Sequence, residues 1–455
     1  MNSANKPSWA IIGGGMMGMT LAYRLAKRGD RVTVYEAGSQ IGGLTSAWNL
    51  GDVVWDKFYH VTLLSDSYLR QLLDEIGLEK EMKWVETKTG FYSGGKLYSM
   101  SNTIEFLKFP PLKFFEKLRL GASIFYASKI KHWSRLEKVS VEDWLRKVAG
   151  NGVTEKIWLP LLRAKLGDTY QKTSAAFIWA AINRMYAARR TGLKKEMFGY
   201  VPGGYARILE RMAGVLKELD VEICTSHPLR TIKADEQTGR VNVCFTDDRE
   251  AEHDNAILTI PSPVISRTCP DLTGDEHQRF QGVEYLGVVC ASLLLKKPLA
   301  GYYVTNITDT WVPLTGVIEM STIVDKQELG GHSLVYLPKY LAADDPGFER
   351  TDEDIREEML STLEKMYPDF TRDDVVEFKI GRARNVMALP TLNYSEKLPP
   401  IKTSIPGVFA VNSAQILKGN LNVNETIQVA EDALNNELKE SRVVKPRASL
   451  VDTAR

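Results

Sequence analysis

The sequence predicts an α/β protein that opens with a Rossmann-like βαβ unit and continues into a second, α+β domain. Two local observations predict this: an apolar run from Trp9 to Ile12 leads straight into a glycine-rich turn, and a helix and a strand pattern follow the turn. The length, 455 residues, exceeds what one ordinary hydrophobic core covers. Hydrophobic residues at 44% and charged residues at 25% are typical of a globular protein. We therefore expect two intertwined domains.

The first forty residues contain each part of a dinucleotide-binding unit, in the right order. The turn reads GGGMMG and begins at Gly13. Apolar residues spaced three and four apart then predict a helix that ends near Gly29. The segment from Arg31 to Tyr35 alternates as a strand and stops at Glu36. Strand, turn, helix, strand and acid together form the βαβ unit that holds a dinucleotide.

Each residue type in this unit has a physical reason. Gly13 permits the tight turn, Gly15 lets the backbone approach a pyrophosphate, and Gly18 lets the helix pack against the strand. The start of the helix, with Met17 in its first turn, offers N–H groups and a positive dipole end to phosphates. Glu36 can accept hydrogen bonds from a ribose diol, and an acid there argues against the 2′-phosphate of NADP.

A second glycine pair separates this chain from NAD dehydrogenases. Ala37 and then the pair Gly42-Gly43 follow where an NAD enzyme normally continues into a helix. On these residues the chain resembles the flavin amine oxidase superfamily, which includes monoamine oxidases, protoporphyrinogen oxidases and phytoene desaturases. The resemblance implies a glutathione-reductase-like domain with FAD as the cofactor. It implies FAD contacts from Glu36, Ala37, Gly42, Gly43, Leu44 and Thr45. The superfamily often has Arg where this chain has Leu44, so a charged phosphate contact is missing or supplied elsewhere.

Two later blocks fit the same domain. After residue 201 a turn, an amphipathic helix and a strand are predicted, followed by a hairpin that turns near Thr238-Gly239. In the superfamily the residue matching Leu229 lies against the adenine. Residues 255–260 are predicted to return to the FAD domain as a strand.

The third block runs from Gly407 to residue 434. A strand is predicted to end at Asn412-Ser413, where the superfamily commonly shows A-G-D; both side chains can still donate or accept hydrogen bonds. A helix is predicted to open at Asn424, and it includes Thr426 in its first turn. Its N–H groups are expected to point at the pyrimidine edge of the flavin.

These blocks divide the chain into two discontinuous domains and a tail. The FAD-binding domain is predicted to comprise residues 1–60, 196–265 and 396–440, the substrate domain residues 61–195 and 266–395, and a flexible tail residues 441–455. Helices are expected near residues 67–76, 111–131, 140–148 and 352–366.

The segment 106–135 of the substrate domain combines aromatic and basic residues, and two interpretations remain open. An apolar face flanked by cations can lie in a membrane interface and draw an oily substrate from it. A core helix with a solvated basic face has a similar pattern. The apolar residues include Phe106, Phe109, Phe114, Phe115, Leu118, Leu120, Ile124, Phe125 and Tyr126.

Seven side chains are candidates for the chemistry or for contact with the substrate. His60 would shuttle a proton beside the flavin, or serve as a structural hydrogen-bonding residue. Glu319, in an apolar strand, would act as a base in a cavity, or lie at the surface. Tyr340, with Tyr302, Tyr303 and Tyr336, would form an aromatic wall for the substrate, or pack in the core. Some amine-oxidising relatives place a lysine near flavin N5, which makes Lys165 a further candidate.

The resemblance and the helical insert predict an FAD-dependent oxidoreductase that moves a hydride from a large apolar substrate to flavin N5. One alternative is a non-redox flavoenzyme like UDP-galactopyranose mutase, whose diphosphate clamp would come from Arg163, Arg184, Arg189 and Arg190. Another alternative is a flavin-binding partner without catalytic activity, suggested by Leu44 and by Asn412-Ser413.

Composition excludes some partners and compartments. The net charge of +1 gives no general attraction to nucleic acid. The four cysteines lie far apart, with neither CxxC pairs nor zinc-finger spacing, which predicts reduced thiols and no metal site. No apolar run is long enough for a membrane span. We expect a cytoplasmic protein, at most peripheral on the inner face of the membrane; nothing in the sequence sets an oligomeric state.

Overall fold

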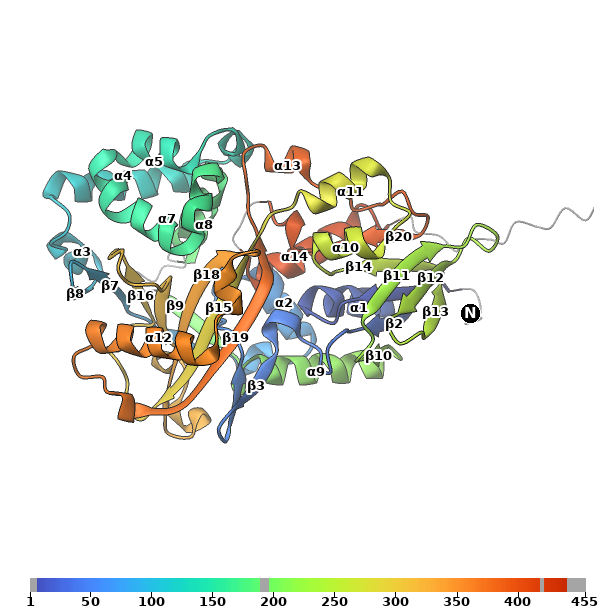
Figure 1. Ribbon diagram of the computed structural model, residues 1–455, viewed down its shortest axis with the longest axis horizontal. Helices are drawn as coiled ribbons and strands as arrows, with labels where there is room; N and C mark the ends of the chain where they lie inside the picture. Colours follow the sequence, from blue (N-terminus) through green and yellow to red (C-terminus); the bar gives the residue numbers. More distant parts are fainter. Residues whose placement is uncertain (1–5, 189–195, 418–420, 440–455) are drawn as a thin grey trace, which may run out of the picture.

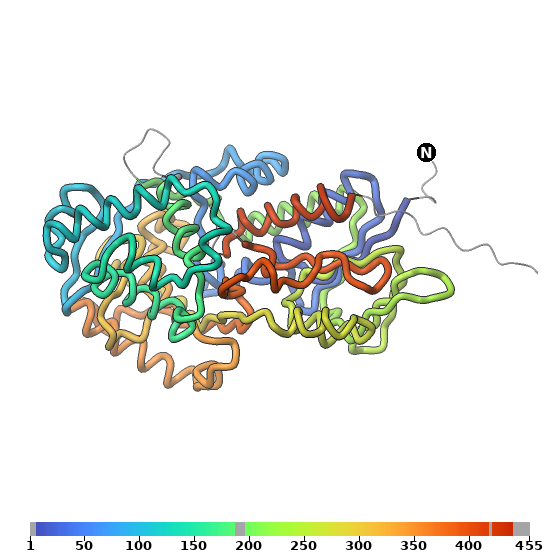
Figure 2. Tube along the Cα trace, turned by 90° about the horizontal axis from the view of Figure 1, so that it is seen from above, coloured from blue at the N-terminus to red at the C-terminus, as the bar shows by residue number. Residues whose placement is uncertain are grey.

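The computed structural model describes residues 6–188, 196–417 and 421–439. The molecule has two lobes, each built on its own sheet (Figure 1). The chain crosses between the lobes several times. As Figure 2 shows, the last helix consequently lies beside segments from the start of the chain.

The first lobe contains a five-stranded parallel sheet with the order β10-β2-β1-β14-β20. The central strand β1 is buried along its whole length, as its unbroken apolar run requires. The sheet joins strands from all three predicted blocks, which confirms the Rossmann-like fold class. The strands are β1 (Ser8–Ile12), β2 (Arg31–Tyr35), β10 (Glu222–Cys224), β14 (Asn255–Leu258) and β20 (Val408–Ala410).

Helices cover one face of this sheet, and a mixed layer covers the other. On the first face α1 (Met16–Arg28), α9 (Gly204–Glu218) and α14 (Val423–Asn435) share one core, and α2 (Ser67–Glu75) packs against α14. On the second face lies an antiparallel sheet with its hairpin turn as predicted. Its strands are β11 (Leu229–Ala234), β12 (Val241–Phe245) and β13 (Glu250–His253).

Two helices extend the first lobe beyond residue 265, where we expected the substrate domain to resume. These are α10 (Ser262–Thr268) and α11 (Gly274–Gln281). Their buried Cys269 and Phe280 belong to the same apolar cluster as Ile12 of β1. The predicted domain boundary at residue 265 is too early, because the apolar faces of both helices pack against the first lobe.

The second lobe contains a seven-stranded sheet with helices on both faces. One face is covered by α12 (Asp352–Met366), which has the predicted bounds. The other is covered by the helical insert: α3 (Thr103–Lys108), α4 (Phe114–Lys129), α5 (Val141–Ala149), α6 (Asn151–Val153), α7 (Leu159–Leu166) and α8 (Ala175–Ala188). In sheet order the strands are β19 (Val375–Ala388), β15 (Tyr285–Leu295), β18 (Ser333–Ala342), β17 (Gly316–Glu319), β16 (Val304–Ile307), β7 (Thr89–Ser93) and β8 (Lys96–Ser99).

A hairpin of β3 (Ala47–Leu50) and β4 (Val53–Asp56) joins the two lobes. Its Trp55 packs in the core of the second lobe. At its end Asp56 has partners on both sides. Its backbone carbonyl accepts a hydrogen bond from the Tyr336 hydroxyl (2.6 Å), and its side-chain carboxyl group accepts one from the Tyr205 N–H at the start of α9 (2.8 Å). A small sheet, β5 (Thr62–Leu63), β9 (Met197–Tyr200) and β6 (Lys83–Glu86), reinforces the junction.

Two predictions on covalent and membrane features can be compared with the described residues. All four cysteines carry free thiols, as expected. Among the helices of residues 6–188, 196–417 and 421–439, none combines the length and the hydropathy that crossing a bilayer requires.

We expect the substitution Tyr336→Phe to lower the free energy of unfolding by about 1 to 3 kcal/mol, because it leaves the buried Asp56 carbonyl without its hydrogen-bond donor. Urea unfolding of the purified protein measures this difference. Tyr126→Phe, at an exposed tyrosine of α4, is the matched control and should leave stability unchanged. Equal midpoints for the two variants would show that the Tyr336 hydroxyl does not join the lobes.

Candidate active site

Two glycine turns lie side by side at the carboxyl end of the first sheet. The Gly42 N–H donates a hydrogen bond to the Gly14 carbonyl (2.8 Å), and Gly15 pairs with Gly42 as a short parallel bridge. Gly13 and Gly42 have φ angles of 112° and 117°, in the region that side chains other than glycine rarely adopt. The two turns thus form one cradle from segments separated by a helix and a strand.

The cradle is closed on one side and open on the other. A Cβ atom at Gly18 would lie 2.0 Å from the Gly13 carbonyl oxygen, so Gly18 allows α1 to pack against the turn, as predicted. A Cβ atom at Gly15 would meet no atom within 4 Å. No side chain caps α1 at Gly15, which leaves the N–H groups of its first turn, including Met17, available to an anion. A pyrophosphate fits this arrangement.

Glu36 is held beside the cradle by two backbone groups. One carboxylate oxygen accepts a hydrogen bond from the Gly14 N–H (2.7 Å) and the other from the Gly38 N–H (2.8 Å). The half-buried carboxylate retains lone pairs for a ribose diol. The Glu36 carbonyl accepts a hydrogen bond from His227, which brings the start of β11 at Leu229 next to this acid; Ala37 is exposed.

Leu44 and Thr45 shape the second glycine turn. The buried Thr45 hydroxyl donates a hydrogen bond to the Gly42 carbonyl (2.8 Å), so its side chain stabilises the turn itself. Leu44 is half-buried and packs against the core of the second lobe. Gly43 is exposed beside Gly15.

In the third block, Asn412 has a different role from the one expected of it. Its side-chain amide donates hydrogen bonds to the Ile260 carbonyl (3.0 Å) and to the Ser262 hydroxyl (3.2 Å), and its oxygen accepts one from the Ala414 N–H. The side chain therefore connects the ends of β14 and β20. Ser413 follows Asn412 in the turn and is half-buried.

The last helix begins one residue earlier than predicted, and its cap is Asn422. The Asn422 side chain accepts a hydrogen bond from the Glu425 N–H. Asn424 instead accepts from the N–H groups of Tyr68 (2.9 Å) and Leu69 (3.2 Å) at the start of α2. The Thr426 hydroxyl donates to the Asn422 carbonyl. The side chains of Asn424 and Thr426 thus form hydrogen bonds within the protein. We expect any flavin contact at the start of α14 to come from backbone groups.

Half-buried His60 lies close to buried Asp56 at the junction of the lobes. The His60 Nδ1 atom lies 2.9 Å from the Phe58 carbonyl and 3.9 Å from the Asp56 carboxyl group, and its ring packs on Tyr205. Burial lowers the pKa of His60 to about 4 and raises the pKa of Asp56 to about 8. Both groups are therefore neutral near pH 7. We did not predict Asp56 as a site residue, although an acid between aromatic residues in WDKFYH could have drawn attention to it.

Glu319 is buried, and one of its oxygens is already bound. It accepts hydrogen bonds from the N–H groups of Ala300 and Gly301, each 3.1 Å long. Burial raises its pKa. Glu319 is therefore not a surface residue. It is also not a base free on both oxygens, because one oxygen stabilises the turn between β15 and β16.

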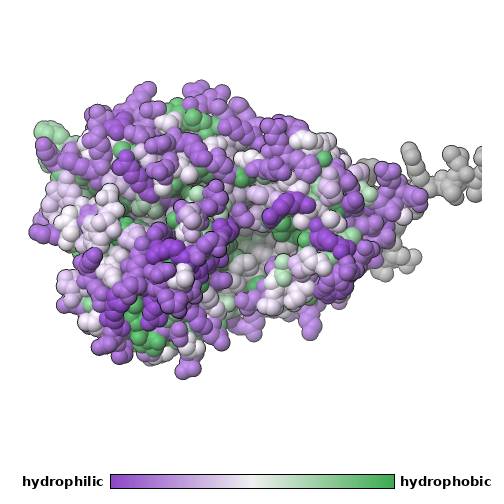
Figure 3. Space-filling view, in the orientation of Figure 1, coloured by the Kyte–Doolittle hydropathy of each residue, from purple (hydrophilic) through white to green (hydrophobic). Residues whose placement is uncertain are grey.

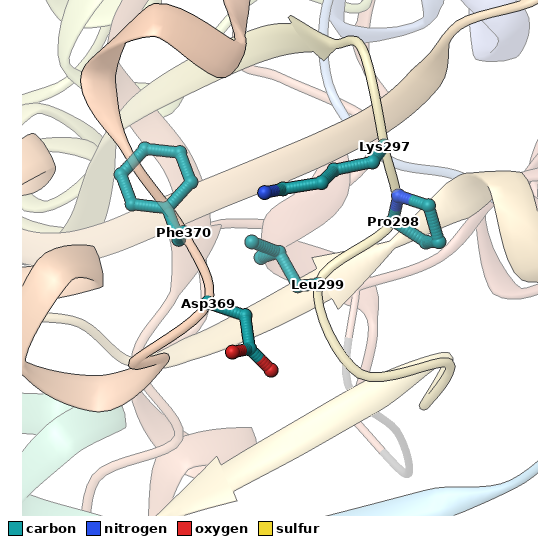
Figure 4. Close-up of a pocket in the computed structure, with 5 residues that line it drawn as sticks. All are labelled: Lys297, Pro298, Leu299, Asp369 and Phe370. Atoms are coloured by element: carbon teal, nitrogen blue, oxygen red, sulfur yellow. The ribbon is translucent and has the colours of Figure 1, made fainter.

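A cavity of about 270 Å³ lies on the same turn. Figure 4 shows that residues 297–299 line one side and Asp369 and Phe370 the other. The Lys297 ammonium at this cavity is paired with Asp374 (3.2 Å). All the lining residues belong to the second lobe, so this cavity is separate from the glycine cradle.

Tyr340 and Lys165, named separately from the sequence, come into contact. The Lys165 ammonium lies 3.1 Å from the centroid of the Tyr340 ring, and the Tyr340 hydroxyl lies 3.2 Å from that of Tyr59. Tyr59 also packs near Tyr336. Tyr59, Tyr340 and Leu44 of the second glycine turn are all half-buried against the same core. We call the pair Tyr59 and Tyr340 the aromatic wall.

Tyr336 and Tyr303 belong to the same core as Tyr59, whereas the two described arginines of the proposed diphosphate clamp have separate partners. Tyr303 packs edge-on against Phe198 in the core, and Tyr302 is half-buried. Arg184 binds the buried Asp66 at 2.9 and 3.2 Å, while Arg163 is exposed over Tyr170. Arg189 and Arg190 lie outside the described residues.

The open space at Gly15 predicts a specific loss of the cofactor. Gly15→Val should fold normally, because its φ of −75° suits any residue, yet it should bind no FAD, because the side chain enters the phosphate position. Flavin absorbance and circular dichroism of the purified variant measure both properties. Gly274→Ala, at another glycine with open space, is the control and should stay fully loaded. Full flavin occupancy in Gly15→Val would contradict the placement of the phosphates.

The raised pKa of Asp56 predicts how stability changes with pH. The folded protein holds this proton up to about pH 8, whereas the unfolded chain releases it near the ordinary value of 3.8. The stabilisation is fully present below the unfolded pKa and is lost as pH rises through the folded one. Asp56→Asn keeps the acceptor for Tyr205 and should flatten the fall of the melting temperature between acidic pH and pH 9. Asp52→Asn, exposed in the same hairpin, should behave like the wild type; a wild-type slope in Asp56→Asn would refute the assignment.

Comparisons with known proteins agree with this geometry. The model of the flavin-containing amine oxidoreductase family matches residues 16–414. A 15-cis-phytoene desaturase of Synechococcus elongatus is 22% identical over 391 residues, covering 79% of this chain and 80% of the relative. An oxidoreductase structure from Methanosarcina mazei superimposes with a TM-score of 0.73 at 17% identity, covering 94% and 100% of the chains. A putrescine oxidase structure reaches a TM-score of 0.71 at 19% identity, covering 95% and 99%.

The cradle, the acid beside it and the three-block sheet suit the ADP half of FAD, and the family match extends over most of the chain. Together they confirm the cofactor and the class of enzyme predicted from the sequence. The chain belongs to the flavin-containing amine oxidoreductase family and is an FAD-dependent oxidoreductase.

Proposed function

We propose that this enzyme oxidises a large apolar substrate by transferring a hydride from a C–H bond to flavin N5. The observation that carries the proposal is the half-buried aromatic wall of Tyr59 and Tyr340, which packs against the same core as Leu44 of the second glycine turn. Flat aromatic surfaces suit extended apolar molecules. The relatives named phytoene and zeta-carotene desaturases support the same substrate class.

Bound FAD supplies the hydride acceptor, and the protein supplies position, electrostatics and exclusion of water. The glycine cradle and Glu36 hold the ADP half. Tyr340, fixed by its contacts with Tyr59 and Lys165, orients the substrate. His60, neutral because it is buried, holds the backbone after β4 through the Phe58 carbonyl; we propose a positioning role for it. Oxygen or another acceptor would reoxidise the flavin.

We give Glu319 no part in this mechanism, since its carboxylate supports a turn in the second lobe. The mutase alternative loses support because Arg184 is paired with Asp66 and Arg163 is exposed over Tyr170. A protein without catalytic activity remains the contrary outcome of the experiment below.

A substrate of this kind is poorly soluble in water, so it has to be collected from a lipid phase. We propose that the segment 106–135 contacts a membrane, with the enzyme as a peripheral protein on its inner face.

An anaerobic half-reaction tests the proposal. The FAD-loaded protein is mixed with polyene hydrocarbons, porphyrinogens and amines, and the loss of oxidised flavin absorbance is followed. We expect reduction by an apolar class, slowed about 10²-fold in Tyr340→Ala because the substrate loses its orientation. Trp311→Ala, at an exposed position of the second lobe, should react at the wild-type rate.

Two results would contradict the proposal. If no compound reduces the flavin, the protein is a flavin-binding partner. If only the chemically reduced protein converts UDP-sugars, it is a mutase.

A further inference from the structure

The helices α3 and α4 direct large apolar side chains outward. Phe115 is 80% exposed, Ile104 66% and Phe114 61%, whereas the buried side of α4 carries small or modest residues such as Ser123 and Ala127. We call this surface the α3–α4 apolar face; it consists of Ile104, Leu107, Phe114, Phe115, Leu118 and Phe125. Phe109 and Leu120 of the same segment are buried in a core, so the segment packs against the protein on one side and presents large apolar side chains to solvent on the other.

Hydrogen bonds hold the helices that carry this apolar face in place. Asn102 caps α3 through the Glu105 N–H, and the Lys117 ammonium donates a hydrogen bond from α4 to the Leu107 carbonyl (2.7 Å). On the inner side, the Trp179 indole of α8 donates to the Ala127 carbonyl (3.0 Å). The exposure of the apolar side chains is therefore imposed by the fold.

The exposed charges of residues 103–135 all have one sign. Between residues 103 and 135 the only acids are Glu105 and Glu116, and both are half-buried and engaged: Glu105 binds Ser99 and Ser101, and Glu116 binds Lys156 (2.8 Å). The exposed charged residues of this segment are Lys108, Lys113, Arg119, Lys129, Lys131 and Arg135. Since the whole chain has a net charge of only +1, this positive charge is a local feature.

We infer that the α3–α4 apolar face docks on a bilayer surface rich in anionic phospholipid, with the aromatic side chains of Phe114 and Phe115 inserted among the lipids. Exposed apolar groups with a basic rim match the acyl boundary and the headgroup charge of such a surface. A second copy of this chain fits less well, because it would place like charges against each other.

The position of the face agrees with a supply route for the proposed substrate, and this part of the inference rests on the proposed function. In Figure 1, α3 and α4 lie at the edge of the second lobe away from the first lobe, and Figure 3 shows hydrophobic surface at that edge. The inner side of α4 packs on α8, whose side chains share a core with Tyr340. A bilayer would thus be separated from the aromatic wall by the helical layer alone.

Flotation of the FAD-loaded full-length protein with vesicles tests the inference. We expect binding to phosphatidylcholine vesicles that contain phosphatidylglycerol, little binding to pure phosphatidylcholine, and release by salt. The double variant Lys113→Gln/Lys129→Gln should reduce the partition coefficient about 30-fold. Phe114→Ser/Phe115→Ser should abolish flotation and still accept FAD. Trp311→Ser/Val376→Ser, at exposed apolar positions on other elements, is the control and should float like the wild type.

Each contrary result is distinct from a failure of the proposed function. Absence of flotation at low salt overturns the inference, and so does equal flotation of the wild type and the Phe114→Ser/Phe115→Ser variant. A dimer in light scattering that this variant abolishes, without flotation, would assign the face to self-association instead. Flotation does not require turnover, so a protein that floats but reduces no flavin would contradict only the enzyme mechanism.

Discussion

The structure depends on the close approach of the two glycine turns. The Gly42 N–H reaches the Gly14 carbonyl only because Gly18 lets α1 sit directly against Gly13 and because residues 13 and 42 adopt left-handed φ angles. This contact fixes where the second turn leaves the first lobe. The β3–β4 hairpin starts from that point, and through it the second lobe is positioned relative to the cradle.

The hydrogen bonds of Asp56 also position the second lobe relative to the first. The Asp56 carbonyl holds Tyr336 of β18, and its carboxyl group caps α9 of the first lobe. Tyr340 lies four residues further along the same strand, where it meets Tyr59 and Lys165. The β3–β4 hairpin therefore connects the glycine cradle to the aromatic wall. The buried polar groups at the junction of the lobes form the hydrogen bonds that hold this hairpin.

The sequence predicted the elements whose signals are local. Apolar periodicity and glycine positions determined β1, α1, β2 and α12, because a side chain's neighbours in a helix or strand are also its neighbours in sequence. The partners of polar side chains were not predictable: Asn424 binds a backbone group 356 residues away, and Asn412 one that is 152 residues away. The pattern of α4 showed an apolar face but not that this face points outward, since orientation is set by packing on α8.

The most direct test of the account is a crystal structure of the protein with FAD. We expect that structure to show the pyrophosphate against the open side of Gly15 at the start of α1 and the ribose on Glu36. The flavin ring should lie between the second glycine turn and the wall of Tyr59 and Tyr340. A flavin ring on another side of the glycine turn, with Tyr59 and Tyr340 outside the substrate site, would contradict the central claim that the two turns position the cofactor for the aromatic wall.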